Sequence, residues 1–100
     1  MSFVLPVDRL HETDSLLAFY HPRPAYPVHV LIVPKKTYAN LMAIPIEDSQ
    51  LMQEVLQMVQ RLVVELGLEE SGYRFICNGG PYQDIPHLHF HLISDQPQNA

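Results

Sequence analysis

Apolar and polar positions follow two different periods along this 100-residue chain. From Glu47 to Leu66, apolar residues recur every three or four positions, while Gln, Glu and Arg mostly fill the other side. This spacing predicts one amphipathic helix over about 47–66, with its apolar stripe turned toward a core. Glu47 and Asp48 favour its start because they complement the positive end of the helix dipole, and Gly67 is placed to end it.

Shorter apolar runs on both sides of this helix predict β-strands. Asp14 and Ser15 are a turn pair between the first two runs, and three prolines in HPRPAYP mark a rigid loop before the third run. The expected strands are RLHET (9–13), LLAFYH (16–21), VHVLIVP (28–34), YRFICN (73–78) and PHLHFHLI (86–93). Together the elements predict an α+β fold, with about five mostly antiparallel strands and one long helix on one face.

Composition and charge narrow the class of protein. With 47% apolar and 17% charged residues, the chain has the composition of a globular protein, and we expect one domain over residues 1–100. A net charge of -5 argues against a nucleic-acid partner, and no apolar stretch approaches the roughly 20 residues of a membrane span. The lone Cys77 and an N-terminus unlike a secretion signal predict a cytoplasmic location.

Three of the six histidines stand at alternate positions near the end of the chain. His87, His89 and His91 share one face of the expected last strand, and the apolar residues between them face the helix. Burial as ordinary core would cost each unpaired imidazole roughly 1 to 3 kcal/mol. We therefore expect these histidines to line a cleft.

Three interpretations of this face remain open. It is a solvated strand without a function, or two of its histidines bind zinc with a carboxylate such as Asp84. In the third interpretation the histidines perform acid-base and nucleophilic chemistry on a phosphoryl group. Imidazole suits that chemistry because its lone pair is available at neutral pH and it also carries protons.

The stretch HLHFHLI resembles the signature of the histidine triad (HIT) family, His-φ-His-φ-His-φ-φ, where φ is apolar. PVHVLIVPKK resembles the family's earlier strand, which carries a fourth histidine, here His29. YRFICNGG resembles the strand that ends in an Asn beside the phosphate site, here Asn78. The likeness runs from about Arg9 to Ile93 and implies the HIT fold.

The resemblance implies a nucleotidyl hydrolase or transferase that acts at the α-phosphate of a nucleoside phosphoramidate, dinucleoside polyphosphate or adenylate. It implies a homodimer and no metal or other cofactor. His89 would be the nucleophile, with its second nitrogen donating to a backbone carbonyl. His91 would contact the phosphate and help to protonate the leaving group, while His87 and His29 would pair as support. Asn78 would bind a phosphate oxygen or the bridging atom.

The resemblance places four further residues at the substrate: Gln83, Asp84, Phe19 and His21. Phe19 stands on the apolar side of the expected base pocket, although an aromatic residue in a strand is also typical of core. Asp84 occupies a position where the family often has Ser or Thr donating to the phosphate. His21 occupies one where nucleotide-binding members often have an Asp that binds the ribose. A non-catalytic module that binds a small phosphate ligand is therefore the alternative.

Overall fold

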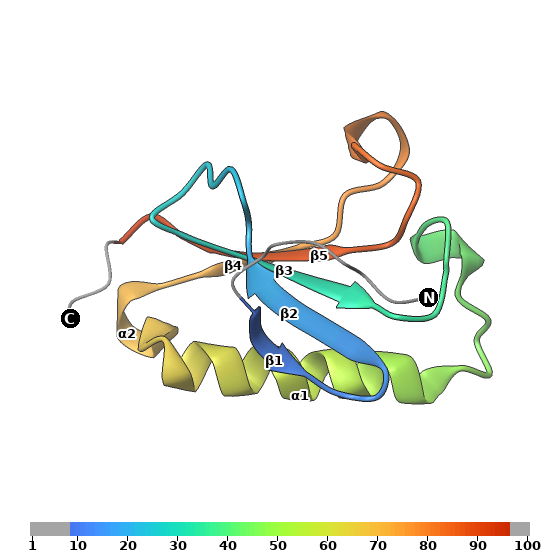
Figure 1. Cartoon of the computed structure of the whole chain (residues 1–100), viewed down its shortest axis with the longest axis horizontal. Helices are drawn as coiled ribbons and strands as arrows, with labels where there is room; N and C mark the ends of the chain where they lie inside the picture. The colour runs from blue at the N-terminus through green and yellow to red at the C-terminus, as the bar shows by residue number, and fades with distance from the viewer. Residues whose placement is uncertain (1–8, 97–100) are drawn as a thin grey trace.

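Five strands form one antiparallel sheet, and one long helix covers one of its faces (Figure 1). The computed structural model describes residues 9–96. The strands are β1 (Arg9–Glu12), β2 (Leu16–Tyr20), β3 (Val28–Pro34), β4 (Arg74–Ile76) and β5 (Phe90–Ser94), in the sheet order β1-β2-β3-β5-β4. The helices are α1 (Ser49–Glu65) and α2 (Leu68–Ser71), with 3-10 turns at Leu41–Ala43 and Gly80–Tyr82. The predicted α+β architecture is confirmed.

The predicted turn between the first two strands is confirmed, and these strands form a hairpin. β1 pairs with β2 across a turn in which the Thr13 backbone N–H donates to the Leu16 carbonyl at 2.9 Å. The Thr13 hydroxyl accepts from the Leu16 N–H at 3.0 Å and from the Ser15 N–H at 3.3 Å. The Thr13 side chain thus provides hydrogen-bond acceptors for two backbone N–H groups of the turn.

The predicted long helix is confirmed, with a start two residues later than Glu47. Asp48 precedes the first helical residue, but its carboxylate makes no capping bond and accepts from the Tyr38 hydroxyl instead. At the other end, Gly67 has a φ of 66°, in the left-handed region. Glycine enters this region without the steric cost that a Cβ brings, so Gly67 ends α1 as predicted. The short α2, which follows directly, was not predicted.

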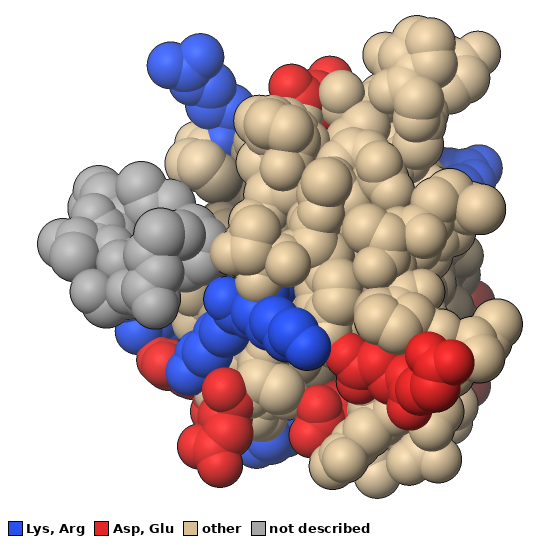
Figure 2. All heavy atoms as spheres, turned by 90° about the vertical axis from the view of Figure 1, so that its right-hand side faces the viewer, with Lys and Arg blue, Asp and Glu red and all other residues tan. Residues whose placement is uncertain are grey.

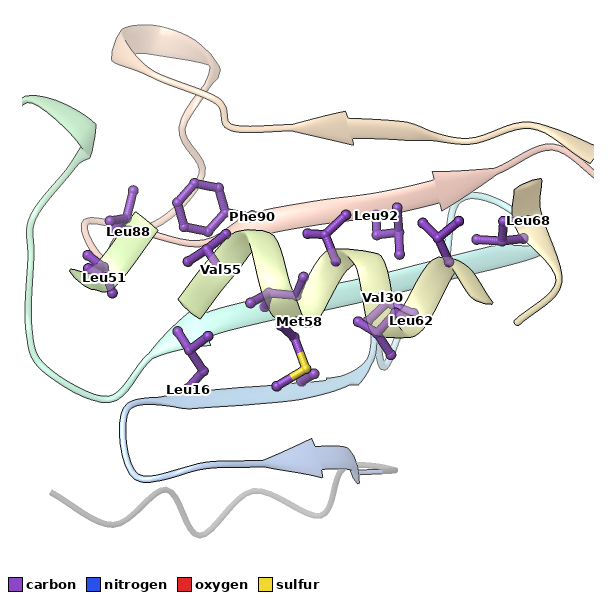
Figure 3. Close-up of a cluster of buried hydrophobic side chains, with 14 of the residues drawn as sticks. Leu16, Val30, Leu51, Val55, Met58, Leu62, Leu68, Leu88, Phe90 and Leu92 are labelled. Atoms are coloured by element: carbon purple, nitrogen blue, oxygen red, sulfur yellow. The ribbon is translucent and has the colours of Figure 1, made fainter. Parts of the chain in front are cut away.

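The core lies between α1 and the sheet (Figure 3). The helix contributes one stripe of buried side chains, and β2, β3 and β5 contribute every second residue. Side chains labelled in Figure 3 include Leu51, Val55, Met58 and Leu62 of the helix, and Leu16, Val30, Phe90 and Leu92 of the strands. In residues 9–96, no helix combines the length and the apolar character needed to cross a membrane.

The last two strands are shorter than the sequence predicts. β5 begins at Phe90, which lies opposite Ile32 of β3, and the residues before it leave the ladder. The Leu88 N–H donates to the Tyr38 carbonyl at 2.8 Å, so a loop partner replaces the neighbouring strand. β4 ends at Ile76, which lies opposite His91, one residue after the start of β5.

Candidate active site

The three alternating histidines lie on the face of the sheet opposite α1. The apolar residues between them belong to the buried core under the helix, which directs the histidines to the other side. This shared face agrees with the prediction, although only His91 lies within β5 itself. His87 and His89 come from the extended segment before it.

Four imidazole rings gather on this face, and we call His21, His29, His89 and His91 the histidine cluster. The ring centroids lie 4.5 Å apart for His21 and His29, 5.2 Å for His29 and His91, and 5.0 Å for His89 and His91. His21 also stacks on His91 at 6.5 Å. The cluster forms because β2 ends beside β3, where the His21 N–H donates to the His29 carbonyl, and β3 pairs with β5.

The predicted pairing of His87 with His29 is wrong. His29 lies opposite Ile93, so the triad histidine that it meets is His91, and the two rings are hydrogen-bonded at 2.9 Å. His87 lies toward the opposite end of β3, where its Nε2–H donates to the Pro34 carbonyl at 3.1 Å. His87 therefore fastens the segment before β5 to the end of β3.

Hydrogen-bond partners determine which nitrogen of His29 and His91 carries the proton. The Ala25 backbone N–H can only donate, and it lies 3.1 Å from Nδ1 of His29. In a neutral His29 the proton is therefore on Nε2, which donates to Nδ1 of His91. His91 consequently carries its own proton on Nε2, a buried atom without a hydrogen-bond partner in the described residues. The result is an N–H donor held in place with its hydrogen-bonding capacity unused.

Burial keeps the rings of His21, His29 and His91 neutral. It is the main reason that the pKa of His91 falls from 6.5 to about 4, and the neighbouring rings of His89, His29 and His21 lower this pKa further. Burial also lowers the pKa values of His21 and His29. At neutral pH these three side chains therefore act as neutral hydrogen-bonding groups.

The position of the ring proton in His89 is the reverse of that in His91. Its Nδ1 lies 2.8 Å from the carbonyl oxygen of His87, which can only accept, so Nδ1 carries a proton. In the neutral ring this leaves the lone pair on Nε2. The backbone contact that the family resemblance implied is thus present, and the side chain is 8% exposed. Whether His89 is the nucleophile remains a prediction.

The proline-rich loop before β3 donates backbone hydrogen bonds to two rings of the histidine cluster. Prolines have no N–H, so in the stretch 22–25 only Arg23 and Ala25 offer backbone donors. The Arg23 N–H donates to Nδ1 of His21 at 2.9 Å, and the Ala25 N–H donates to Nδ1 of His29. The Tyr26 ring also meets His29 edge-on, with centroids 5.6 Å apart. These contacts were missed, and the alternation of proline with other residues was the available signal.

Gln83 and Asp84 lie in the loop that leads into the triad. The side-chain amide of Gln83 donates to the carbonyls of Ala39 and Ile85, at 2.8 and 2.9 Å, so this nitrogen already ties the loop together. Asp84 is exposed, and its negative charge raises the pKa values of His21 and His91 against the stronger effect of burial. Asp84 therefore acts electrostatically on His21 and His91, and its contact with substrate stays a prediction.

Asn78 and Phe19 have different surroundings. Asn78 is half-buried and follows β4 by two residues. Phe19 is 7% exposed and packs in a second apolar cluster with Leu17 and Val33. It is separated from His91 by the strand that carries Leu31, which lies opposite both residues. The observed surroundings of Phe19 are thus those of a packed apolar residue.

The zinc interpretation finds no ligand set in the described part of the chain. Between residues 9 and 96, no group of three or more His, Cys, Asp or Glu side chains is arranged so that it could hold a metal ion. The rings of the histidine cluster instead bond to one another and to backbone groups.

Comparison with known proteins identifies the family. The model of the HIT domain matches residues 2–98, nearly the whole chain. This chain belongs to the HIT domain family. An uncharacterized HIT-like protein of Synechococcus elongatus is 40% identical to it over 91 residues, covering 89% of this chain and 79% of the relative.

Two further relatives of this HIT domain have more informative names. The crystal structure of a HIT family hydrolase from Legionella pneumophila superposes with a TM-score of 0.86 at 34% identity, covering 92% of this chain and 84% of the other. The purine nucleoside phosphoramidase of Escherichia coli is 27% identical over 95 residues, covering 93% of this chain and 80% of that enzyme. The resemblance to the histidine triad family and the HIT fold are confirmed, and the chain is similar to family hydrolases.

Proposed function

We propose that this HIT domain is a nucleotidyl hydrolase or transferase that cleaves a bond to the α-phosphate of a nucleotide derivative. One observation carries the proposal: the backbone sets complementary protonation on two adjacent rings. His89 keeps a lone pair on Nε2, and His91 offers an unpaired Nε2–H. A nucleophile beside a prepositioned donor is the arrangement that phosphoryl transfer requires.

The reaction has two steps. Nε2 of His89 forms a bond to phosphorus while the bond from phosphorus to the leaving atom breaks, and the bonding electron pair stays on the leaving atom. That atom takes a proton from solvent and departs, while the Nε2–H of the neutral His91 donates a hydrogen bond to a phosphoryl oxygen. Water then attacks phosphorus, the bond from phosphorus to Nε2 of His89 breaks, and the nucleoside 5′-phosphate leaves with the loss of a proton to solvent, which restores His89. Attack by another acceptor in place of water would give the nucleotidylated acceptor.

Within this class we propose nucleoside phosphoramidates as substrates. The similarity to the purine nucleoside phosphoramidase of Escherichia coli supports this choice. Asn78, half-buried after β4, would donate to a phosphoryl oxygen, and His21 would donate from its Nε2–H, since its Nδ1 accepts from Arg23. His87 would act indirectly, by holding the segment that carries His89.

Turnover of a fluorogenic adenosine 5′-phosphoramidate tests the proposal. We expect the wild type to release the fluorophore in the presence of a chelator and His89→Ala to be inactive, because no other group would carry the covalent nucleotidyl intermediate. His11→Ala is the matched control, since His11 contacts Glu65 of α1, away from the histidine cluster. Brief incubation with a substrate labelled in the nucleotide should place the label on His89.

Three other outcomes would contradict the proposal. Retained ligand binding without turnover would favour the non-catalytic binding module. Full activity of His89→Ala, or a label on another residue, would remove His89 from the reaction. Loss of activity with the chelator would point to metal-dependent chemistry.

We also propose that residues 1–100 form a single domain that assembles into a homodimer. β4 is an edge strand, and Phe75 within it and Tyr73 directly before it are 40% and 49% exposed. On α1, Met52 and Leu56 are 38% and 57% exposed, and apolar surface of this kind favours association. Sedimentation of the wild type against Phe75→Glu tests the dimer. The cytoplasmic location remains a prediction that cell fractionation can test.

A further inference from the structure

Asp84 stands three residues before His87, in a loop that is anchored on both sides. Before it, the Gln83 side chain donates to the Ala39 carbonyl, and after it the Leu88 N–H donates to the Tyr38 carbonyl. The loop from 83 to 88 is therefore docked at both ends onto the segment 38–39. Asp84 itself is exposed, and its carboxylate has no ion-pair partner in the described part of the chain.

Basic side chains do not neutralise this carboxylate. Of the six Lys and Arg residues, five pair with carboxylates elsewhere, for example Lys35 with Glu12 at 2.7 Å. Figure 2 shows acidic and basic side chains lying next to each other across the lower half of one face. The remaining cation, Arg23, is exposed, and its backbone N–H is the group that contacts the histidine cluster.

The reaction centre therefore has an unbalanced charge. His21, His29 and His91 are neutral at neutral pH, so they offer dipoles and no full positive charge. Asp84 is the one carboxylate among the described residues whose field acts on both His21 and His91. A phosphoryl group in contact with His89 and His91 would place its leaving group within reach of that field.

We infer that Asp84 determines the leaving-group specificity of this enzyme, favouring leaving amines that carry a positive charge over those that carry a negative charge. The inference rests on the proposed function and specifies its substrate class as nucleoside phosphoramidates of cationic amines. The loop anchors hold residue 84 three positions before the triad, where its field acts on His21 and His91. An ammonium group is attracted there, whereas a carboxylate or polyphosphate is repelled without a cation to offset it.

Three adenosine 5′-phosphoramidates test the inference. Their leaving amines have similar length and end in an ammonium (from 1,3-diaminopropane), a methyl group (from n-butylamine) or a carboxylate (from β-alanine). We expect kcat/KM to fall in that order, and Asp84→Asn to reduce the ratio between the cationic and anionic substrates by about 3- to 10-fold. Asp14→Asn removes the same charge from the β1–β2 turn and should leave the ratio unchanged. High salt should reduce the ratio in the wild type, because it screens charges at this exposed position.

Equilibrium binding separates this inference from the proposed function. In His89→Ala the three ligands stay intact, and their dissociation constants should rise from the cationic to the anionic ligand. Asp84→Asn in the same background should remove most of this difference. Turnover with the same charge ratio in Asp84→Asn as in the wild type would overturn the inference alone. Charge-ordered binding without wild-type turnover would overturn the proposed function alone.

Discussion

Acidification from pH about 7 to about 5 should destabilise the fold through His91. Its pKa is 6.5 in the unfolded chain and about 4 in the folded protein, so between these values the unfolded state binds more protons. Stability from a group whose folded pKa is depressed is present above the unfolded pKa and is lost as the pH falls toward the folded pKa. Integrating this difference gives at most about 2 kcal/mol. The ring is partly exposed, so we expect about 1 kcal/mol.

Thermal and urea unfolding at the two pH values provide the measurement. A loss of about 1 kcal/mol lowers the Tm of a domain of this size by about 4 to 8 °C. The control is His91→Asn, because the Asn side-chain oxygen can accept from Nε2 of His29 but does not titrate. This variant should show a smaller loss of stability at pH 5. Some loss should remain, because burial lowers the pKa values of His21 and His29 as well.

NMR titration of the ring protons provides the direct check. The His91 resonance should stay at its neutral position down to pH about 5, well below the ordinary histidine pKa. An apparent pKa near 6.5 for His91, or equal pH dependence in the wild type and His91→Asn, would refute the argument. The titration of Glu12 and Glu65 does not interfere with this measurement. A hydrogen bond and charge attraction from Lys35 hold the pKa of Glu12 below the usual range, and the same two interactions with His11 lower the pKa of Glu65.

Two further predictions concern the fold. Leu62→Ala should lower the free energy of unfolding by about 2 to 5 kcal/mol, because Leu62 is fully buried under the sheet, whereas Met42→Ala, at an 88% exposed position, should change it by less than about 0.5 kcal/mol. Gly67→Ala should cost about 1 kcal/mol because φ is 66°, and Gly79→Ala, where φ is −136°, should cost less; equal costs in urea unfolding would contradict the role assigned to Gly67.

The helix and the hairpin were predictable because their signals are local. The stripe of α1 repeats over a 17-residue helix, and Gly67 marks its end. The start of β5 was not predictable in the same way. It depends on the Tyr38 carbonyl, which is distant in sequence and takes the Leu88 N–H away from the ladder.

The candidate site shows the same division. Alternation of residues placed the three histidines on one face, but it could not show which histidine pairs with which. That pairing follows from the register between β3 and β5, in which His29 lies opposite Ile93 and so meets His91. The backbone donors of Arg23 and Ala25 were equally hidden, since a residue type does not reveal where its amide points.

The alternating prolines of the loop before β3 limit which substitutions the site can accept. The backbone N–H of residue 25 sets the direction of the hydrogen bond from His29 to His91. Any residue type that has a backbone N–H at this position preserves that direction. A fourth proline in this loop, at position 25, would remove the backbone hydrogen that sets the direction of this hydrogen bond, without changing any histidine. The chemistry of the histidines is thus sensitive to a residue whose side chain takes no part in it.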